Sequence, residues 1–410
     1  MHEKNKKSIF AKEGSATIVE KLSEVFTIRT REVLKQGRMF ISKRKSPDQE
    51  YENMFVLTKT HLYYLFEKTE RDRNLITIKS IAKIELQWVH SQFYNREGDD
   101  GHERLYFSFN KNGKSAIFRV EDKLEYEEWK RLLFIHTIQS NFFEVYKVLS
   151  SIGVGSTANV FKIQDSITGQ YYACKRFKKS KLVKSAYKYL VNEINVLRKV
   201  QGHPNIVKFH GLFESSNSVY IITELCEGGR LIKPQQRYKS FEIAEMAKTL
   251  IKLLGYLKKH EIVHRDLKPG NILLKYENQP ITQNQIKVID FGISATKESE
   301  HEEYKVLGTV GYMCPESFYM SYLPNHKFDI YSLGVVLYNG ITGKKLFMDR
   351  TKDKMMINNK RGKVDFFDFH FQAVDKERKL ISKEHSVEDA HIRRRNQDQR
   401  GGAAQQRHLR

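Results

Sequence analysis

The stretch HRDLKPGN, from His264 to Asn271, constrains this chain more than any other part of its sequence. It is a polar loop between an apolar run, Ile272 to Leu274, and a preceding set of leucines at helical spacing: Leu250, Leu253, Leu254 and Leu257. Buried elements on both sides would hold the loop's polar side chains against a substrate. Asp266 could accept a proton from a hydroxyl, Lys268 could neutralise a moving phosphate, and Asn271 could hold a divalent cation.

Upstream of this loop, the chain carries a glycine-containing segment with the features of a phosphate cradle. In SIGVGSTANVFK, which begins at Ser151, Gly153 and Gly155 would let a tight hairpin bring backbone N–H groups close to a phosphate. A G-x-G pattern by itself is more often an ordinary turn, so its meaning depends on the residues downstream of it.

An apolar run that ends in a lysine comes next along the chain. Lys175 closes the run Tyr172 to Lys175, and a buried lysine is costly unless it is paired. Glu193 is the candidate partner, in a segment whose apolar residues recur at helical spacing: Leu190, Ile194 and Leu197.

Downstream of the HRDLKPGN loop, an acidic residue emerges from another apolar strand. Val288 and Ile289 precede Asp290, which is followed by Phe291 and Gly292. A carboxylate and the amide of Asn271 are oxygen ligands of the kind that Mg²⁺ prefers. The two segments together predict a magnesium site.

In this order, the motifs resemble those of eukaryotic protein kinases, and HPNIV from His203 and VYIITELCEGG from Val219 continue the resemblance. It implies a bilobal α+β fold over residues 146–381, with ATP and Mg²⁺ as cofactors. Asp266, Lys268 and Asn271 would be catalytic, and Asn271 and Asp290 would hold the metal. The residues that the resemblance assigns to ATP are Ile152, Gly153, Gly155, Ser156, Val160, Ala173, Lys175, Glu193, Thr223, Glu224, Cys226 and Leu273.

The same resemblance predicts the substrate class. Lys268, two residues after Asp266, and Thr309, expected to hydrogen-bond the loop, are typical of serine/threonine protein kinases, so protein Ser/Thr hydroxyls are the expected acceptors. Two features favour an alternative, a catalytically weak nucleotide-binding pseudokinase or scaffold. Ala158 replaces the family's third loop glycine. Beyond Ser382 the chain has no apolar helical periodicity, and residues 382–410 are expected to form a polar, basic, disordered tail.

The N-terminal third has a different pattern. Residues 1–32 are polar and weakly periodic and are expected to form a flexible or loosely helical lead. Short alternating strands are expected at Met54–Leu57, His61–Phe66, Leu75–Ile78 and Leu105–Phe109. A helix should begin near Asp122, capped through Glu125, and bury the face Trp129, Leu132, Leu133 and His136.

Strands closed by one C-terminal helix suggest a small β-barrel, and FVLT, LYYL and Trp129 make residues 33–140 similar to a pleckstrin-homology (PH) domain. This resemblance implies a phosphoinositide or protein partner. The basic residues offered to a phosphoinositide are Lys35, Arg38, Lys43, Arg44 and Lys45. Asn53 stands where lipid-binding relatives place an arginine, which favours a docking role. Phe142 to Tyr146 is expected to link this domain to the next.

The formal charge of +22 raises a third possibility, a basic nucleic-acid binder. The basic residues are scattered and are not joined to a nucleic-acid module, so no specific nucleic-acid partner is expected. Three widely spaced cysteines and the absence of an apolar leader or membrane-length run predict a cytoplasmic protein, peripheral at the inner membrane surface if the PH-like domain binds lipid.

Overall fold

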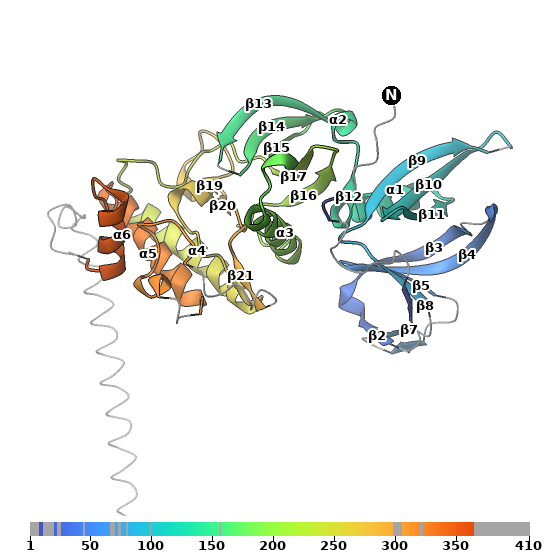
Figure 1. Ribbon diagram of the computed structural model, residues 1–410, viewed down its shortest axis with the longest axis horizontal. Coiled ribbons are helices and arrows are strands. Elements are labelled where there is room, and N and C mark those ends of the chain that lie inside the picture. Colours follow the sequence, from blue (N-terminus) through green and yellow to red (C-terminus); the bar gives the residue numbers. More distant parts are fainter. Residues whose placement is uncertain are drawn as a thin grey trace, which may run out of the picture. The chain divides into compact units, whose positions relative to one another are not determined.

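The computed structural model describes residues 8–10, 20–22, 26–43, 46–65, 70–72, 75–78, 81–98, 100–155, 157–297, 306–319 and 323–364 (Figure 1). Arg44, Lys45 and the tail expected at residues 382–410 lie outside these ranges. The structure divides into two compact units. The first holds Met1–Gln201 and Lys208–Leu225, and the second holds Gly202–Val207 and Cys226–Arg410. Within the described ranges, no helix combines the length and the apolar character needed to cross a membrane.

The first unit begins with a β-rich region that is followed by the helix α1 (Lys123–His136). Its main sheet runs in the order β1-β8-β5-β4-β3-β11-β10-β9. The bounds of these strands are β1 Glu20–Leu22, β3 Val33–Lys43, β4 Ser46–Thr58, β5 His61–Leu65, β8 Ile81–Glu85, β9 His90–Glu97, β10 Glu103–Lys111 and β11 Lys114–Val120. A smaller sheet pairs β7 (Leu75–Ile78) with β2 (Phe26–Arg29) and β6 (Glu70–Asp72), and the short 3-10 helix η1 spans Thr30–Glu32.

Aromatic side chains form the core of the β-rich region. Phe107 and Phe118 stack with their ring centroids 4.9 Å apart, and Phe55 meets Phe118 edge-on at 5.6 Å. Trp129 of α1 is fully buried in the same cluster. Asp122 caps α1 by accepting a hydrogen bond from the Glu125 backbone nitrogen at 2.7 Å, as its sequence predicted.

Residues 1–32 are more ordered, where the structure describes them, than the flexible lead that the sequence predicts. β1 and β2 lie in the two sheets of the first unit, and Phe10 is completely buried. The reason is tertiary: these short segments gain their partners from strands and side chains distant in sequence, which local periodicity does not report.

The main sheet continues from the β-rich region into a second half through the two-residue strand β12 (Ile138–Gln139). β12 pairs in parallel with β9 on one side and with β16 on the other, so the order runs on as β12-β16-β17-β15-β14-β13. These strands are β13 Tyr146–Val154, β14 Asn159–Asp165, β15 Tyr171–Lys178, β16 Phe209–Glu214 and β17 Ser218–Glu224. Helix α3 (Lys184–Lys199) belongs to this half, with the short 3-10 helix η2 (Lys179–Lys181) before it (Figure 1).

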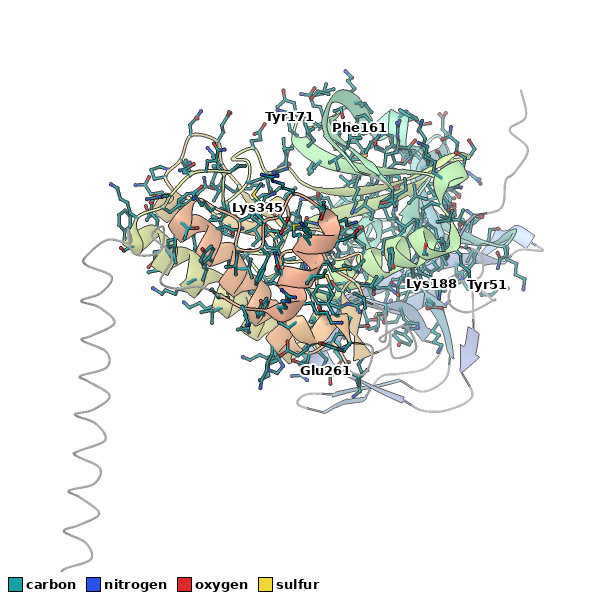
Figure 2. The ribbon with its side chains drawn as sticks, turned by 60° about the vertical axis from the view of Figure 1, so that its left-hand side comes forward. Tyr51, Phe161, Tyr171, Lys188, Glu261 and Lys345 are labelled. Carbon is teal, nitrogen blue, oxygen red and sulfur yellow. The ribbon has the colours of Figure 1, made fainter. Side chains whose placement is uncertain are left out.

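The segment expected to be a linker is instead packed into this second half. Phe142, in the short helix α2 (Phe142–Val145), stacks on Tyr220 at 4.1 Å and is 2% exposed. Figure 2 shows Phe161 and Tyr171, which come from the neighbouring strands β14 and β15. Phe142 is buried in one cluster with Tyr146, Phe213 and Tyr220, which joins the chain before and after residue 146 into one body.

The second unit contains the helices α4 (Ser240–Lys259), α5 (His326–Thr342) and α6 (Lys352–Arg361). The leucines predicted to form a helical face lie buried on α4. Two small antiparallel pairs accompany the helices: β19 (Ile272–Leu274) with β20 (Ile286–Val288), and β18 (Ile262–Val263) with β21 (Ala295–Thr296). Short 3-10 helices are η3 Pro269–Asn271, η4 Ile281–Gln283 and η6 Pro315–Phe318.

Candidate active site

The glycine-containing segment forms the turn between β13 and β14 in the first unit. Gly155 donates its backbone N–H to the Ala158 carbonyl at 2.9 Å, and a Cβ on Gly155 would lie 3.0 Å from that oxygen. A side chain at this position would crowd the turn, so glycine keeps it tight. Ile152 on β13 is 49% exposed and Ala158 is buried. Ser156, also assigned to ATP by resemblance, lies outside the described residues.

Strand register brings several predicted nucleotide-binding residues to one face of the sheet. Val160 lies opposite both Gly153 and Lys175, and Ala173 lies opposite Thr223. Because side chains two residues apart on a strand share a face, Val160, Ala173, Lys175 and Thr223 all project to the same side. Among these four residues, apolar and small side chains lie beside the cation of Lys175, which suits an adenine ring next to phosphate.

The predicted pair between Lys175 and Glu193 is present. Lys175 Nζ donates to both carboxylate oxygens of Glu193, at 2.8 and 2.9 Å. Glu193 is on α3 and is 5% exposed, so the lysine compensates a charge that is largely removed from solvent. Loss of one partner of a buried pair typically costs about 3–5 kcal/mol. The pair therefore ties α3 to β15.

Thr223 and Glu224 end β17, and Glu224 is tied to the start of β16. Its backbone N–H donates to the Lys208 carbonyl at 2.9 Å, and its carboxylate accepts from the Lys208 N–H at 2.7 Å. The Glu224 carboxylate therefore already has a backbone partner. We expect the backbone groups of this segment, and not this side chain, to recognise an adenine edge.

In the second unit, the chain after Cys226 runs beside β19. The Gly228 N–H donates to the Leu274 carbonyl at 3.0 Å, and the Leu274 N–H donates to the Gly229 carbonyl at 2.8 Å. A Cβ on Gly228 would lie 2.4 Å from the Tyr276 carbonyl oxygen, closer than atoms can approach, so only glycine fits. Leu273, the residue before Leu274 on β19, is partly exposed.

The HRDLKPGN loop concentrates its polar side chains on Asp266. Lys268 Nζ donates to Asp266 Oδ2 at 2.6 Å, and the Thr309 hydroxyl donates to Asp266 Oδ1 at 2.5 Å. Lys268 also donates to the Thr309 hydroxyl at 2.7 Å, and Asn271 Nδ2 donates to Asp266 Oδ2 at 2.9 Å. The predicted bond between Thr309 and the loop is therefore confirmed, and the carboxylate is held in a single orientation.

The backbone of this loop is anchored by Asp329 on α5. Its two carboxylate oxygens accept the N–H groups of His264 at 2.7 Å and Arg265 at 2.9 Å. Burial raises the pKa of Asp329, while these hydrogen bonds favour the ionised form. Two N–H donors directed at the two oxygens stabilise the carboxylate against the effect of burial. Arg265 takes a strained backbone conformation with φ of +66°, which the anchor stabilises.

The candidate metal ligands are brought together by the β19–β20 pair. The Ile289 N–H donates to the Asn271 carbonyl at 3.0 Å, so Asp290 follows directly beside Asn271. Asn271 uses its amide nitrogen for Asp266, which orients its side-chain oxygen as the atom able to ligate a cation. This donor set fits Mg²⁺, which prefers one or two protein oxygens together with phosphate and water. In the described parts of the chain, no cluster of three or more His, Cys, Asp or Glu side chains could hold a metal by itself.

Comparison with known proteins agrees with this geometry. The family model described as "Protein kinase domain" matches residues 146–406. The chain belongs to the protein kinase family. Calcium-dependent protein kinase 4 of Plasmodium falciparum is 32% identical over 269 residues, covering 64% of this chain and 50% of that protein. Death-associated protein kinase dapk-1 of Caenorhabditis elegans is 30% identical over 252 residues, covering 60% of this chain and 17% of that protein.

A plant relative gives the same result. Calcium-dependent protein kinase 24 of Arabidopsis thaliana is 32% identical over 225 residues, covering 54% of this chain and 38% of that protein. The chain thus spans half or less of the length of these curated relatives. The matched segment is the protein kinase domain, and the β-rich region before residue 146 lies outside the family match.

One residue that positions the protein kinase site was missed from the sequence. Asn359 of α6 is fully buried, accepts the Gly311 N–H at 2.7 Å, and donates to the Met313 carbonyl at 2.7 Å. It thereby holds the segment that follows Thr309. The surrounding sequence of α6 is polar, so nothing local distinguishes Asn359 from its exposed neighbours. Cys314, close to this segment, is buried, and burial raises its pKa to about 11.

Proposed function

We propose that this chain is an ATP-dependent protein kinase that transfers the γ-phosphoryl group to serine or threonine hydroxyls of protein substrates. The observation that carries the proposal is the cluster around Asp266, in which Lys268, Thr309 and Asn271 all contact one carboxylate. A structural carboxylate would gain stability from such bonds too, but Asp266 is partly exposed and can therefore meet a substrate.

Each residue of the cluster would have a separate role in the transfer. Asp266 would orient the acceptor hydroxyl and receive its proton, because it is a carboxylate held within a network of donors. Lys268 would balance negative charge on the phosphoryl group. Asn271 and Asp290 would hold Mg²⁺, which supplies positive charge to the phosphates when bound.

The proposed nucleotide-binding residues belong to the first unit, except Leu273 and Cys226, which belong to the second. Lys175, fixed by Glu193, would contact the phosphates, and the N–H groups around Gly153 and Gly155 would cradle them. Ile152, Val160, Ala173 and Leu273 would contact the adenine ring, and Ser156 would join the cradle. Thr223, Glu224 and Cys226 would line the adenine edge.

The test is Asp266→Asn in the full chain, with Asp353→Asn as a matched control because Asp353 is exposed on α6. Asp266→Asn keeps the size of the side chain and the contact with Lys268, but it removes the base. Transfer from labelled ATP to a generic basic protein should fall by about 10³-fold or more, while ATP affinity by calorimetry stays within a few-fold. Equal transfer by Asp266→Asn and the wild type would exclude this mechanism.

The competing function is a nucleotide-binding scaffold that transfers phosphate weakly. The feature that favours it is Ala158, which is buried in the phosphate loop where relatives carry a third glycine. Wild-type chain that binds ATP but shows no transfer above the Asp266→Asn background would support the scaffold and exclude the kinase.

We propose further that the β-rich region is a PH-like barrel that docks a protein partner. In support, its first long strand β3 pairs with its last strand β11, and α1 follows with Trp129 in the core. Lys35, offered above as a phosphate ligand, instead donates to Glu128 at 2.6 Å and its side chain is only 8% exposed, which weakens the lipid alternative. Liposome pelleting tests this proposal. Enrichment of the chain on phosphoinositide vesicles would show that the region binds lipid and would contradict a role in protein docking alone.

A further inference from the structure

Residues Ser8, Ile9 and Phe10, which we call the docking segment, sit in a socket built from elements far away in sequence. Phe10 is completely buried and stacks on Trp88, with ring centroids 5.0 Å apart and an interplanar angle of 22°. Its ring also lies 6.2 Å from that of Tyr187 on α3. The Tyr187 hydroxyl donates to the Ile9 carbonyl at 3.1 Å, so both the side chain and the backbone of the segment are held.

The polar side of the socket is Glu214, at the end of β16. Its carboxylate accepts from the Ser8 hydroxyl at 2.6 Å and from the Ile9 N–H at 2.8 Å. It also accepts from Lys179 Nζ at 2.7 Å and His90 Nε2 at 2.9 Å. These bonds lower the pKa of Glu214 to about 2 against the effect of burial, so the carboxylate is charged at any physiological pH.

This arrangement joins α3 to the β-rich region near the start of the helix. Trp88 precedes β9 and His90 begins it, whereas Tyr187 lies on α3, and the docking segment fills the space between them. A second connection lies in the last turn of α3. There, buried Arg198 donates to the Gln87 carbonyl at 2.8 Å and the Thr137 carbonyl at 3.1 Å.

The helix held in this way carries Glu193, the partner of Lys175. Tyr187 and Arg198 lie on either side of Glu193 along α3, so the two connections bracket the ion pair. Loosening the connection at Tyr187 would allow the first turns of α3 to move while Arg198 still holds the last turn. The docking segment is therefore placed to control the position of Glu193.

We propose that Ser8 is a phosphorylation site, and that its phosphorylation releases the docking segment and loosens the first half of α3. The seated Ser8 hydroxyl donates to a carboxylate that is 5% exposed. A phosphoryl group there carries a charge near −2 and offers acceptors, so it would replace a hydrogen bond with repulsion. Lys179 already pairs with Glu214 and could not neutralise both groups.

The modification takes place on the released segment, since the seated hydroxyl points at Glu214. The Ser8 oxygen attacks the γ-phosphorus of ATP held by a modifying protein kinase, the bond to the β–γ bridging oxygen breaks, and ADP leaves. The hydroxyl proton passes to the base of that kinase. Lys4, Lys6 and Lys7 precede Ser8, so the modifying kinase should present an acidic surface to this segment.

The test compares amide hydrogen exchange of full-length chains carrying serine or genetically encoded phosphoserine at position 8. Phosphoserine should raise exchange in residues 184–190 of α3 by at least about tenfold, since a hydrogen bond to a charged group is worth that factor or more. Phosphoserine at position 115 is the matched control, because Ser115 is exposed in the same unit. Exchange does not require phosphoryl transfer by this chain, so failure here is distinct from failure of the proposed kinase activity.

A second variant keeps the test decisive. Phe10→Ala empties the aromatic half of the socket and should raise exchange in the same residues without any added charge. If phosphoserine at position 8 leaves hydrogen exchange in α3 unchanged while Phe10→Ala raises it, phosphorylation of Ser8 does not release the docking segment. If neither change raises exchange in α3, the docking segment does not hold the helix and the inference fails.

Discussion

His136, in the last turn of α1, should make the first unit less stable in mild acid than at neutral pH. Its side chain is 7% exposed, and its Nδ1 has no hydrogen-bond partner within the described residues. Burial, with the positive charges of Arg198 and Lys59, lowers its pKa from 6.5 to about 4. The unfolded chain therefore takes up a proton below pH 6.5 that the folded chain refuses until about pH 4.

The size of this effect can be worked out from the two pKa values. They differ by about 2.5 and each pKa unit is worth about 1.4 kcal/mol, so the total is about 3 kcal/mol. Above the unfolded-state pKa the ring is neutral in both states, so its titration does not lower the free energy of unfolding. As the pH falls from there toward the folded-state pKa, only the unfolded chain gains the proton, and the free energy of unfolding decreases progressively. Between about pH 7.5 and about pH 4.5, the free energy of unfolding should decrease by about 2.5 kcal/mol, which is most of the total effect.

The assay is urea unfolding of the full chain at these two pH values, followed by tryptophan fluorescence. His136→Leu replaces the titrating ring with an apolar side chain of similar size, so the variant should lose about 2.5 kcal/mol less than the wild type on acidification. His102→Leu is the matched control, because His102 is exposed in the turn between β9 and β10. If wild type and His136→Leu lost the same free energy between the two pH values, the reasoning would be refuted.

Two further predictions concern the loop around Asp266. Thr309→Val removes a hydroxyl that donates to Asp266 and accepts from Lys268, so kcat in a phosphoryl-transfer assay should fall about tenfold or more with the KM for ATP little changed; an unchanged kcat would contradict the role of the hydroxyl. Asp329→Asn turns one accepting oxygen toward His264 and Arg265 into a donor, so urea unfolding should show a loss of about 2–4 kcal/mol; a loss under about 0.5 kcal/mol would mean that Asp329 does not anchor the loop.

Much of the local structure could be predicted from sequence, because the signals are local. The cap at Asp122 and the apolar spacing along α1 depend on residues within a few positions of each other, and both are present. The same holds for β7, predicted with its observed bounds. The Lys175–Glu193 pair is not local, but it was predicted because a lysine in an apolar strand needs a partner for its charge.

The linker and the N-terminal lead were predicted less well, since both depend on distant partners. Phe142 looked like part of a connector, yet it stacks on Tyr220, which lies a long stretch of chain away. Ser8 and Phe10 occur in a polar segment without periodicity, and their partners Glu214 and Trp88 are identified only when the chain has folded.

The sequence by itself identified the residues that we propose for catalysis and metal binding: Asp266, Lys268, Asn271 and Asp290 are recognisable from motif order, because catalysis restricts residue type at fixed spacing. Tertiary structure alone decided how the β-rich region is joined to the protein kinase domain. β12 bonds to β9 and β16 through backbone groups, which every residue except proline carries in full. Because this pairing does not depend on side-chain type, the sequence pattern does not predict it, and it is seen only in the folded structure.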